Sequence, residues 1–190
     1  MYSVIKTLGR TMKLQTFFPF VDDILGAFAC SLGMDMSAYR NHVYRVLNYL
    51  LLLVPEHGEN ADLLLIAAAF HDLGIWTDGT FDYLEPSRRL ARNYLAVKGL
   101  AHFGPEVEAI ITHHHKLTPY RGAFSPTVEP FRQADLVDVS LGVIRFGIRP
   151  EWVCTIKAEF PNAGFHRRLV ALTCRQFLKN PLHPLPMIRW

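Results

Sequence analysis

The feature that most constrains the fold is an almost entirely apolar segment that runs from Ala61 to Leu73. A helix that is apolar on every side belongs in the interior of a protein, so we expect this segment to form a central buried helix. His71 and Asp72 lie side by side near its end, and Gly74 is expected to close it. Burying such a pair costs several kcal/mol unless a partner neutralises or coordinates it. Taken alone, however, the pair is more typical of a surface helix end or of an isolated hydrogen bond.

The spacing of apolar residues predicts helices along the whole chain. Gly33 is expected to end the first helix, Pro55 to end the second, and Asn60 or a neighbour to begin the central one. Proline in a first helical turn marks two further starts, at Pro86 and Pro105. The predicted helices span residues 19–32, 35–54, 61–73, 86–97, 105–114 and 128–143, and two amphipathic helices lie between 150 and 180. Because alternating strand patterns are absent, the sequence predicts an all-α, single-domain helical bundle over residues 1–190.

Composition and charge exclude several classes of protein. Half of the residues are apolar and 19% are charged, which excludes a disordered chain. The net charge of +3 is too small for a dedicated nucleic-acid binder but is compatible with an anionic small substrate. The longest apolar runs are well short of the roughly 20 residues that span a bilayer, and no signal peptide is evident. We therefore expect a cytoplasmic protein without membrane or nucleic-acid partners, and a homo-oligomer stays open.

The three cysteines, Cys30, Cys154 and Cys174, show no spacing typical of a zinc site or a disulfide framework. Each lies among apolar residues, and unpaired cysteines are among the most often buried residues. We expect three buried, reduced thiols.

Two other predicted helices carry residues that change the meaning of the His71-Asp72 pair. His42 lies within residues 41–46 (NHVYRV), and Asp135 lies within residues 134–138 (ADLVD). Together with residues 70–74 (FHDLG), these strings resemble the HD phosphohydrolase superfamily, whose pattern is a histidine, a His-Asp doublet and a distant aspartate. The resemblance covers roughly residues 37–143, the motif-bearing core, onto which the helices at 150–180 are expected to pack.

The resemblance implies a helical bundle that holds one divalent cation through His42, His71, Asp72 and Asp135. Two imidazoles and two carboxylates suit manganese, cobalt, nickel, iron, zinc or magnesium, so the sequence does not select the metal. A water bound to such an ion has a lowered pKa and becomes a nucleophile, while the ion polarises a phosphoryl oxygen. The second oxygen of Asp72 is a candidate for orienting this water, which gives Asp72 a catalytic role as well.

Two further residues are candidates for catalysis. Arg45 lies on the same helical face as His42, and it either clamps a phosphate or forms an ion pair with a structural carboxylate. Glu85 resembles an acidic position that members of the superfamily often have beside the metal, as a general acid or an acceptor for a ligand imidazole. The alternative for Glu85 is an ordinary acid at a helix start. Asp138, one turn after Asp135, is expected to support a ligand rather than to bind metal.

A run of three histidines, His113 to His115, precedes Lys116. Similar proteins often have one or two histidines here, at the pocket wall or on a second metal ion. The apolar face of the predicted helix favours His114 as the inward residue, with His113 next and His115 in solvent. We therefore expect His113, His114 and Lys116 to contact the substrate, although an exposed lysine at a helix end needs no function. His102 is expected in a loop.

The sequence thus indicates a metal-dependent phosphohydrolase that uses a metal-activated water on a small phosphorylated substrate, either a phosphomonoester or a nucleotide. Two alternatives stay open. The same fold hosts small-nitrile hydratases and di-iron oxygenases, for which the histidine run would supply ligands to a second ion. A non-catalytic nucleotide-sensing module would keep the site for binding alone, although intact ligands argue against it.

Overall fold

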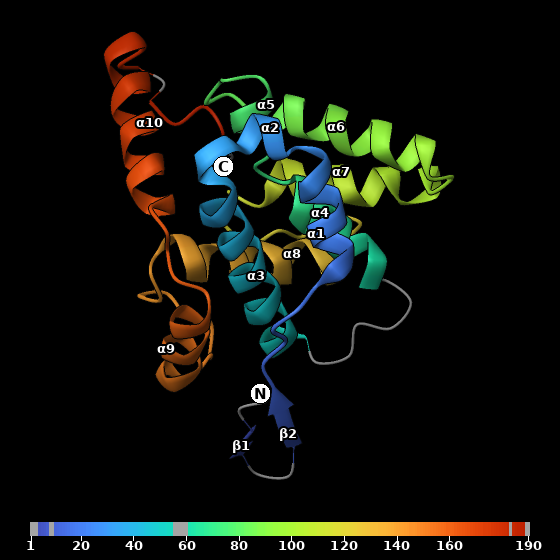
Figure 1. Cartoon of the computed structure of the whole chain (residues 1–190), viewed down its shortest axis with the longest axis vertical. Coiled ribbons are helices and arrows are strands. Elements are labelled where there is room, and N and C mark those ends of the chain that lie inside the picture. Colours follow the sequence, from blue (N-terminus) through green and yellow to red (C-terminus); the bar gives the residue numbers. More distant parts are fainter. Residues whose placement is uncertain (1–3, 8–9, 55–60, 183, 189–190) are drawn as a thin grey trace.

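The computed structural model describes residues 4–7, 10–54, 61–182 and 184–188, and helices dominate it (Figure 1). The described helices of four or more residues are α1 (Pro19–Ala27), α2 (Ala29–Leu32), α3 (Met36–Leu53), α4 (Ala61–Phe70), α5 (Gly74–Thr77), α6 (Leu84–Val97), α7 (Gly104–His113), α8 (Ser125–Val139), α9 (Pro150–Glu159) and α10 (Phe165–Lys179). The predicted all-α class is confirmed for this helical body.

A two-stranded hairpin, which the sequence does not predict, precedes the helices. Its strands β1 (Val4–Thr7) and β2 (Arg10–Lys13) are antiparallel, with Val4 opposite Lys13. The hairpin lies at one end of the molecule, apart from the helical body (Figure 1). Neither strand alternates apolar with polar residues, since β1 reads VIKT and β2 reads RTMK, so the pattern that indicates a strand is absent from the sequence.

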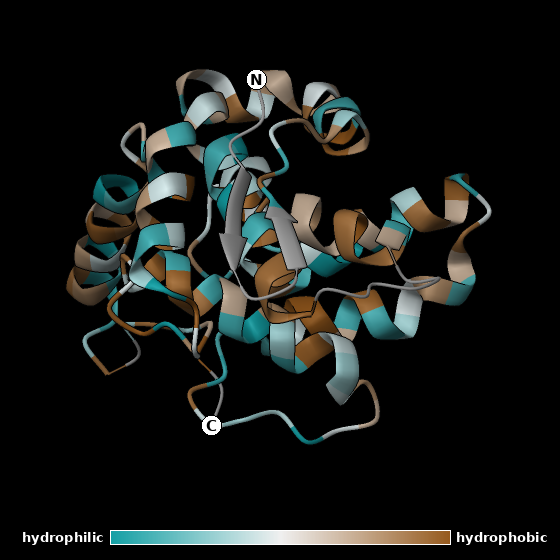
Figure 2. Ribbon diagram, turned by 90° about the horizontal axis from the view of Figure 1, so that it is seen from below, coloured by the Kyte–Doolittle hydropathy of each residue, from teal (hydrophilic) through white to brown (hydrophobic). Residues whose placement is uncertain are grey.

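Helix α4 occupies the centre of the body, as its composition predicts. Leu63, Ile66 and Phe70 are fully buried, and so are the three alanines at 67–69. The helix packs against α1, α3, α6 and α7. The helices around it combine hydrophilic and hydrophobic residues along their length (Figure 2), so they can cover α4 with one face and meet solvent with the other.

The central helix ends earlier than its apolar pattern suggests. It stops at Phe70, and a turn follows before α5 begins at Gly74. The prediction that Gly74 closes the central helix is therefore wrong. A Cβ atom at Gly74 would lie 2.6 Å from the carbonyl oxygen of Tyr83 and 2.9 Å from the backbone nitrogen of Ser87. Glycine is thus required for the close approach of α5 to the start of α6.

Other helix boundaries follow the predictions with small differences. The first predicted helix is divided at Phe28 into α1 and α2. Helix α8 ends at Val139 rather than at 143, because Leu141 and Gly142 adopt positive φ angles of 57° and 84°. The predicted helix end at Pro55 and the predicted start near Asn60 lie outside the described residues.

The two C-terminal helices contact the motif-bearing core through α3. Phe165, the first residue of α10, is fully buried, whereas much of the rest of α10 extends beside the body (Figure 1). The tail after α10 returns to the body. There Met187, only 5% exposed, packs in a small hydrophobic cluster with Ile75, Phe81, Tyr83 and Leu84.

Two further sequence expectations are tested by the described residues. No helix among them has both the length and the apolar character that a membrane span needs. All three cysteines are free but exposed, so the prediction of buried thiols is wrong. Cys154 lies on the outward face of α9, whose apolar residues Trp152, Val153 and Ile156 point inward, whereas around Cys174 on α10 the apolar residues Val170, Phe177 and Leu178 are exposed as well.

Candidate metal centre

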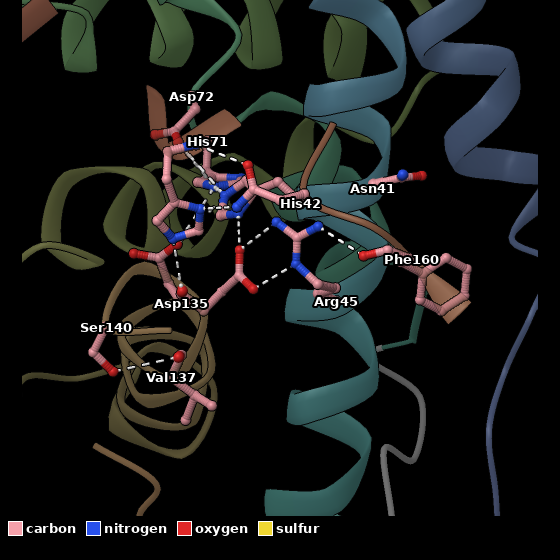
Figure 3. Close-up of polar contacts among 12 residues, drawn as sticks. Asn41, His42, Arg45, His71, Asp72, Asp135, Val137, Ser140 and Phe160 are labelled. Atoms are coloured by element: carbon pink, nitrogen blue, oxygen red, sulfur yellow. Dashed lines mark hydrogen bonds and ion pairs between the residues drawn. The ribbon is translucent and has the colours of Figure 1, made fainter. Parts of the chain in front are cut away.

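Three helices bring the four predicted ligands to one buried place (Figure 3). His42 lies within α3, His71 and Asp72 lie in the turn after α4, and Asp135 lies near the end of α8. Because α3 packs against both α4 and α8, residues far apart in the chain meet here. None of the four is more than 2% exposed.

The donor atoms of these residues have the spacing of ligands around a single ion. The Nε2 atoms of His42 and His71 are 2.9 Å apart. Oδ2 of Asp72 lies 3.6 Å and 3.4 Å from these two nitrogens, and Oδ1 of Asp135 lies 3.5 Å and 3.8 Å from them. Ligand atoms at about 2.0 to 2.2 Å from one cation lie roughly 3 to 4 Å from their neighbours. The four side chains therefore fit a divalent ion between them.

Hydrogen bonds on the far side of each ring direct the histidine lone pairs toward this point. His42 Nδ1 lies 2.7 Å from Asp138 Oδ2, and His71 Nδ1 lies 2.8 Å from the carbonyl oxygen of Ala68. Carbonyl and carboxylate oxygens accept hydrogen bonds, so each Nδ1 carries the proton that it donates. The Nε2 atoms then face each other as acceptors, an arrangement that a shared proton or a cation stabilises.

Further donor atoms continue from this point toward the histidine run. Asp72 Oδ1 lies 3.2 Å from His114 Nε2, and Asp135 Oδ2 lies 3.5 Å from His115 Nδ1. Within the described part of the chain, three buried atoms of this centre, Asp72 Oδ1, Asp135 Oδ1 and His114 Nε2, make no contact with hydrogen-bond geometry. Such atoms are uncommon in native proteins and indicate an ion or a ligand. The described residues contain three overlapping groups that could hold a metal ion: His42-His71-Asp135, His71-Asp72-His114 and His114-His115-Asp135.

The histidine run is therefore oriented differently from the sequence prediction. His114 is buried and faces the site, as expected. His115, expected in solvent, also faces the site, and its Nε2 is hydrogen-bonded to the hydroxyl of Tyr83. His113, expected to face the pocket, packs instead on the ring of Tyr120, with 4.8 Å between ring centroids. Helix α7 ends at His113, so the next two rings follow the geometry of a turn and not that of a helix.

Burial and mutual charge shift the pKa values within the centre. Burial lowers the pKa of His42 to about 4. Burial acts in the same direction on His71, but the charges of Asp72 and Asp135 raise its pKa to about 9. Burial raises the pKa of Asp135 to about 7, whereas for Asp72 the effect of burial is outweighed by the charge of His71, and its pKa stays well below the ordinary value. Protons on His71 and Asp135 therefore compete with a cation at neutral pH.

Arg45 supports the centre from outside and does not point into it. Its guanidinium is 2% exposed and donates to both oxygens of Asp138, over 2.6 Å from Nε and 2.8 Å from Nη2. Nη1 donates to the carbonyl oxygen of Phe160 over 3.0 Å. The structure therefore has the ion pair with a structural carboxylate, and these bonds turn the guanidinium away from a phosphate. Burial acts to raise the pKa of Asp138, but hydrogen bonds from His42 and Arg45 hold it well below the ordinary value.

Two supporting residues are absent from the sequence analysis. The hydroxyl of Tyr39 donates to the carbonyl oxygen of Ala69 over 3.0 Å and accepts from the backbone N–H of Asp72 over 3.3 Å, which holds the turn after α4. Tyr39 lies three residues before His42 on the same helical face, a spacing that could have indicated it. The ring of Phe165 stacks on His42 with 4.0 Å between centroids. No local signal in the sequence indicates this contact.

Glu85 and His102 lie away from the centre. Glu85 is exposed in the first turn of α6 and forms an ion pair with Arg88 over 2.8 Å. The structure thus has the ordinary helix-start acid and not a residue beside the metal, because the first turn of α6 directs this side chain to solvent. His102 is exposed in a short 3-10 helix, Ala101–Phe103, between α6 and α7.

A cavity opens from the centre on the side of the histidine run. Its volume is about 230 Å³, and Asp72, His114, His115 and Asp135 lie at its inner end. Lys116 lines the cavity too, and its contact with a substrate stays a prediction. The remaining lining is mostly apolar and comes largely from α8, α10 and the tail.

Comparison with known protein families places these residues in a wider pattern. A family model described as the HD domain matches residues 39–140, more than half of the chain. The matched range contains all four predicted ligands. No curated protein sequence and no solved structure matches the chain.

Proposed function

Because the chain belongs to the HD domain family, whose members bind divalent metal ions and are usually hydrolases, we propose that this protein is a metal-dependent phosphohydrolase. In this proposal His42, His71, Asp72 and Asp135 bind the cation, and a small phosphorylated compound enters through the cavity above them. One observation carries the proposal: the Nε2 atoms of His42 and His71 approach to 2.9 Å with both Nδ1 protons already donated elsewhere.

A divalent cation at this place would lower the pKa of a bound water and polarise a phosphoryl oxygen. The protein's own groups supply the rest. Asp72 directs Oδ2 toward His42 and His71 and Oδ1 toward the cavity side, where it can accept a proton from the attacking water. Lys116, at the cavity wall, offers a positive charge to the phosphate. Arg45 and Asp138 hold the His42 ring in place, and they do not contact substrate.

Elemental analysis and a substrate screen test this proposal together. The purified protein should retain about one divalent ion per chain and release inorganic phosphate from one or more small phosphomonoesters or nucleotides. His71→Ala and Asp135→Asn should each abolish both properties. Glu85→Gln, a change at an exposed carboxylate, is the matched control and should keep both. Stoichiometric metal in the His71→Ala protein, or full activity without any divalent ion, would show that the proposal is wrong.

A second candidate function, a di-iron oxygenase, is favoured by the continuation of donor atoms toward His114 and His115. Asp72 and Asp135 each turn one oxygen toward His42 and His71 and the other toward the histidine run. Bridging carboxylates of this kind can hold two ions side by side. Two irons per chain with consumption of dioxygen would support this candidate, whereas one ion per chain with release of phosphate supports hydrolysis.

A further inference from the structure

The cavity above the metal centre is small. Its volume of about 230 Å³ is below the roughly 300–1,000 Å³ of sites that hold drug-sized ligands. The loop before α6, the segment after α7, helices α8 and α10, and the tail at 185–188 each contribute to its wall. Apolar side chains from all of them face the cavity: Phe81, Leu117, Leu136, Val139, Leu169 and Ile188.

Polar groups are scarce on this wall beyond the metal centre. Among the described residues that line it, Lys116 is the one cation outside the histidines, and Thr173 offers a hydroxyl. The hydroxyl of Tyr83 is already hydrogen-bonded to His115. Arg132, which is buried and donates to the carbonyl oxygen of the lining residue Lys116, does not line the cavity, and it forms an ion pair with Glu129 over 2.6 Å and 2.7 Å.

A nucleotide or sugar phosphate would therefore be a poor fit. Each buried hydroxyl or ring nitrogen that loses water without finding a partner costs about 1–3 kcal/mol. Burying an apolar group on such a wall instead stabilises the complex, by about 0.8 kcal/mol for each CH₂. We infer that the cavity seats the organic part of the substrate and that this part is a compact apolar group, aryl or branched alkyl. The inference rests on the proposed function for the phosphate end of the substrate.

The tail completes the apolar wall. Met187 is buried against Ile75, Phe81 and Leu84, which fixes the chain on either side of it. Ile188 and Leu185 line the cavity together with Leu136 and Val139 of α8. Substrate width is accordingly set by a segment that lies outside residues 39–140, the part that matches the HD domain.

Binding to the metal-loaded protein tests the inference without relying on turnover. Isothermal titration calorimetry would compare inorganic phosphate, phenylphosphonate and adenosine 5′-monophosphate. Burial of one ring should make phenylphosphonate bind about 10- to 100-fold more tightly than inorganic phosphate, because the ring leaves water for an apolar wall. The adenosine compound should bind no more tightly than phosphate.

Two adjacent residues of α10 provide a matched pair of variants. Leu169 lines the cavity, whereas Val170 is 62% exposed. Leu169→Gln should remove most of the advantage of phenylphosphonate and leave phosphate binding unchanged, and Val170→Gln should change neither. Should Leu169→Gln fail to fold, Val139→Thr, which keeps nearly the same shape, should reduce the same advantage by about fivefold or more, because it places one hydroxyl on the wall.

The outcomes separate this inference from the proposed function. If phosphate binds but phenylphosphonate binds no more tightly, or the adenosine compound binds best, the apolar seat is wrong while the phosphohydrolase stands. If phosphate does not bind at all, the proposed function is wrong, and phenol becomes the probe for the cavity alone. Binding of phenol that is lost in Leu169→Gln and kept in Val170→Gln supports the apolar seat, and any other pattern overturns it.

Discussion

The two sides of the His42 imidazole differ in how completely their polar atoms are paired. On the Nδ1 side, Asp138 accepts from His42 and twice from Arg45, and Arg45 also donates to backbone carbonyls. On the Nε2 side, Oδ1 of Asp72 and Oδ1 of Asp135 are buried and have no hydrogen-bond partner among the residues that the structure describes. Both sides are buried, since none of Arg45, Asp138, Asp72 and Asp135 is more than 2% exposed.

This difference in hydrogen-bond pairing distinguishes residues that hold the His42 ring in place from residues that form a binding site. A buried polar cluster that satisfies itself stabilises the fold and orients its members. A buried cluster that leaves acceptors unpaired is complete only when something else binds there. By this criterion Arg45, which the sequence offers as a phosphate clamp, belongs to the supporting side, and His114 with His115 belongs to the binding side.

The largest expected contrast is between Asp138→Asn and Asp135→Asn, the same substitution one turn apart on α8. Asp138→Asn leaves the buried Arg45 without its counter-charge, which should lower the free energy of unfolding by about 3–5 kcal/mol. Asp135→Asn should leave the metal-free protein equally or more stable at pH 8. Burial raises the pKa of Asp135 to about 7, so its ionisation weakens the fold as the pH rises above the ordinary aspartate value. Urea denaturation gives the free energy of unfolding of both variants. Equal decreases in the two would show that the two sides of His42 do not differ in this way.

Added cation should stabilise the wild-type protein but not the variants that lack a ligand on the Nε2 side of His42. At a free cation concentration of 100 times Kd, the wild-type protein should gain about 2.7 kcal/mol of stability, because the ion binds only the folded state. His71→Ala and Asp135→Asn should gain none, and Glu85→Gln should gain as much as the wild type. Melting temperatures with and without manganese or zinc give the result. A metal-dependent shift in Asp135→Asn would remove this carboxylate from the ligand set.

The affinity for the cation should rise with pH in two stages. The pKa of Asp135 is raised to about 7 and that of His71 to about 9, so both carry protons below pH 7 and His71 alone between pH 7 and 9. A cation must displace these protons to bind. The association constant for the cation should therefore rise about a hundredfold per pH unit below pH 7, where two protons leave, and about tenfold per unit from pH 7 to 9, where one leaves. Each proton corresponds to ~1.4 kcal/mol per pH unit. Competition with a metal-binding dye measures the slope. A flat profile would mean that these residues bind no metal.

The smallest change in stability and activity is expected from a substitution at Glu85, which contacts neither side of the His42 ring. Its side chain is 62% exposed and pairs with Arg88 on the surface of α6. Glu85→Gln should change the free energy of unfolding by less than about 1 kcal/mol. Activity and metal content should stay within about twofold of the wild type. A tenfold loss of activity with an unchanged melting temperature would indicate that Glu85 takes part in catalysis after all.

The sequence alone was sufficient for most of the elements and for the choice of the four central side chains. Local signals such as Pro105 at a helix start, and the apolar composition of α4, depend on neighbours within a few turns, so they survive in any tertiary context. The resemblance of their motifs to the HD superfamily implied that His42, the His71-Asp72 doublet and Asp135 meet, and the structure brings them together. Their role as metal ligands stays a prediction.

Only the tertiary structure decided where the remaining side chains point. His115 turns inward and His113 outward because α7 ends between them and the helical period no longer applies. Arg45 is committed to Asp138, and Gly74 is required by the approach of Tyr83 and Ser87, contacts that join segments distant in the chain or across a turn. The apolar wall of the cavity combines α8, α10 and the tail. Such contacts depend on how whole elements pack, and no local pattern of residues encodes that.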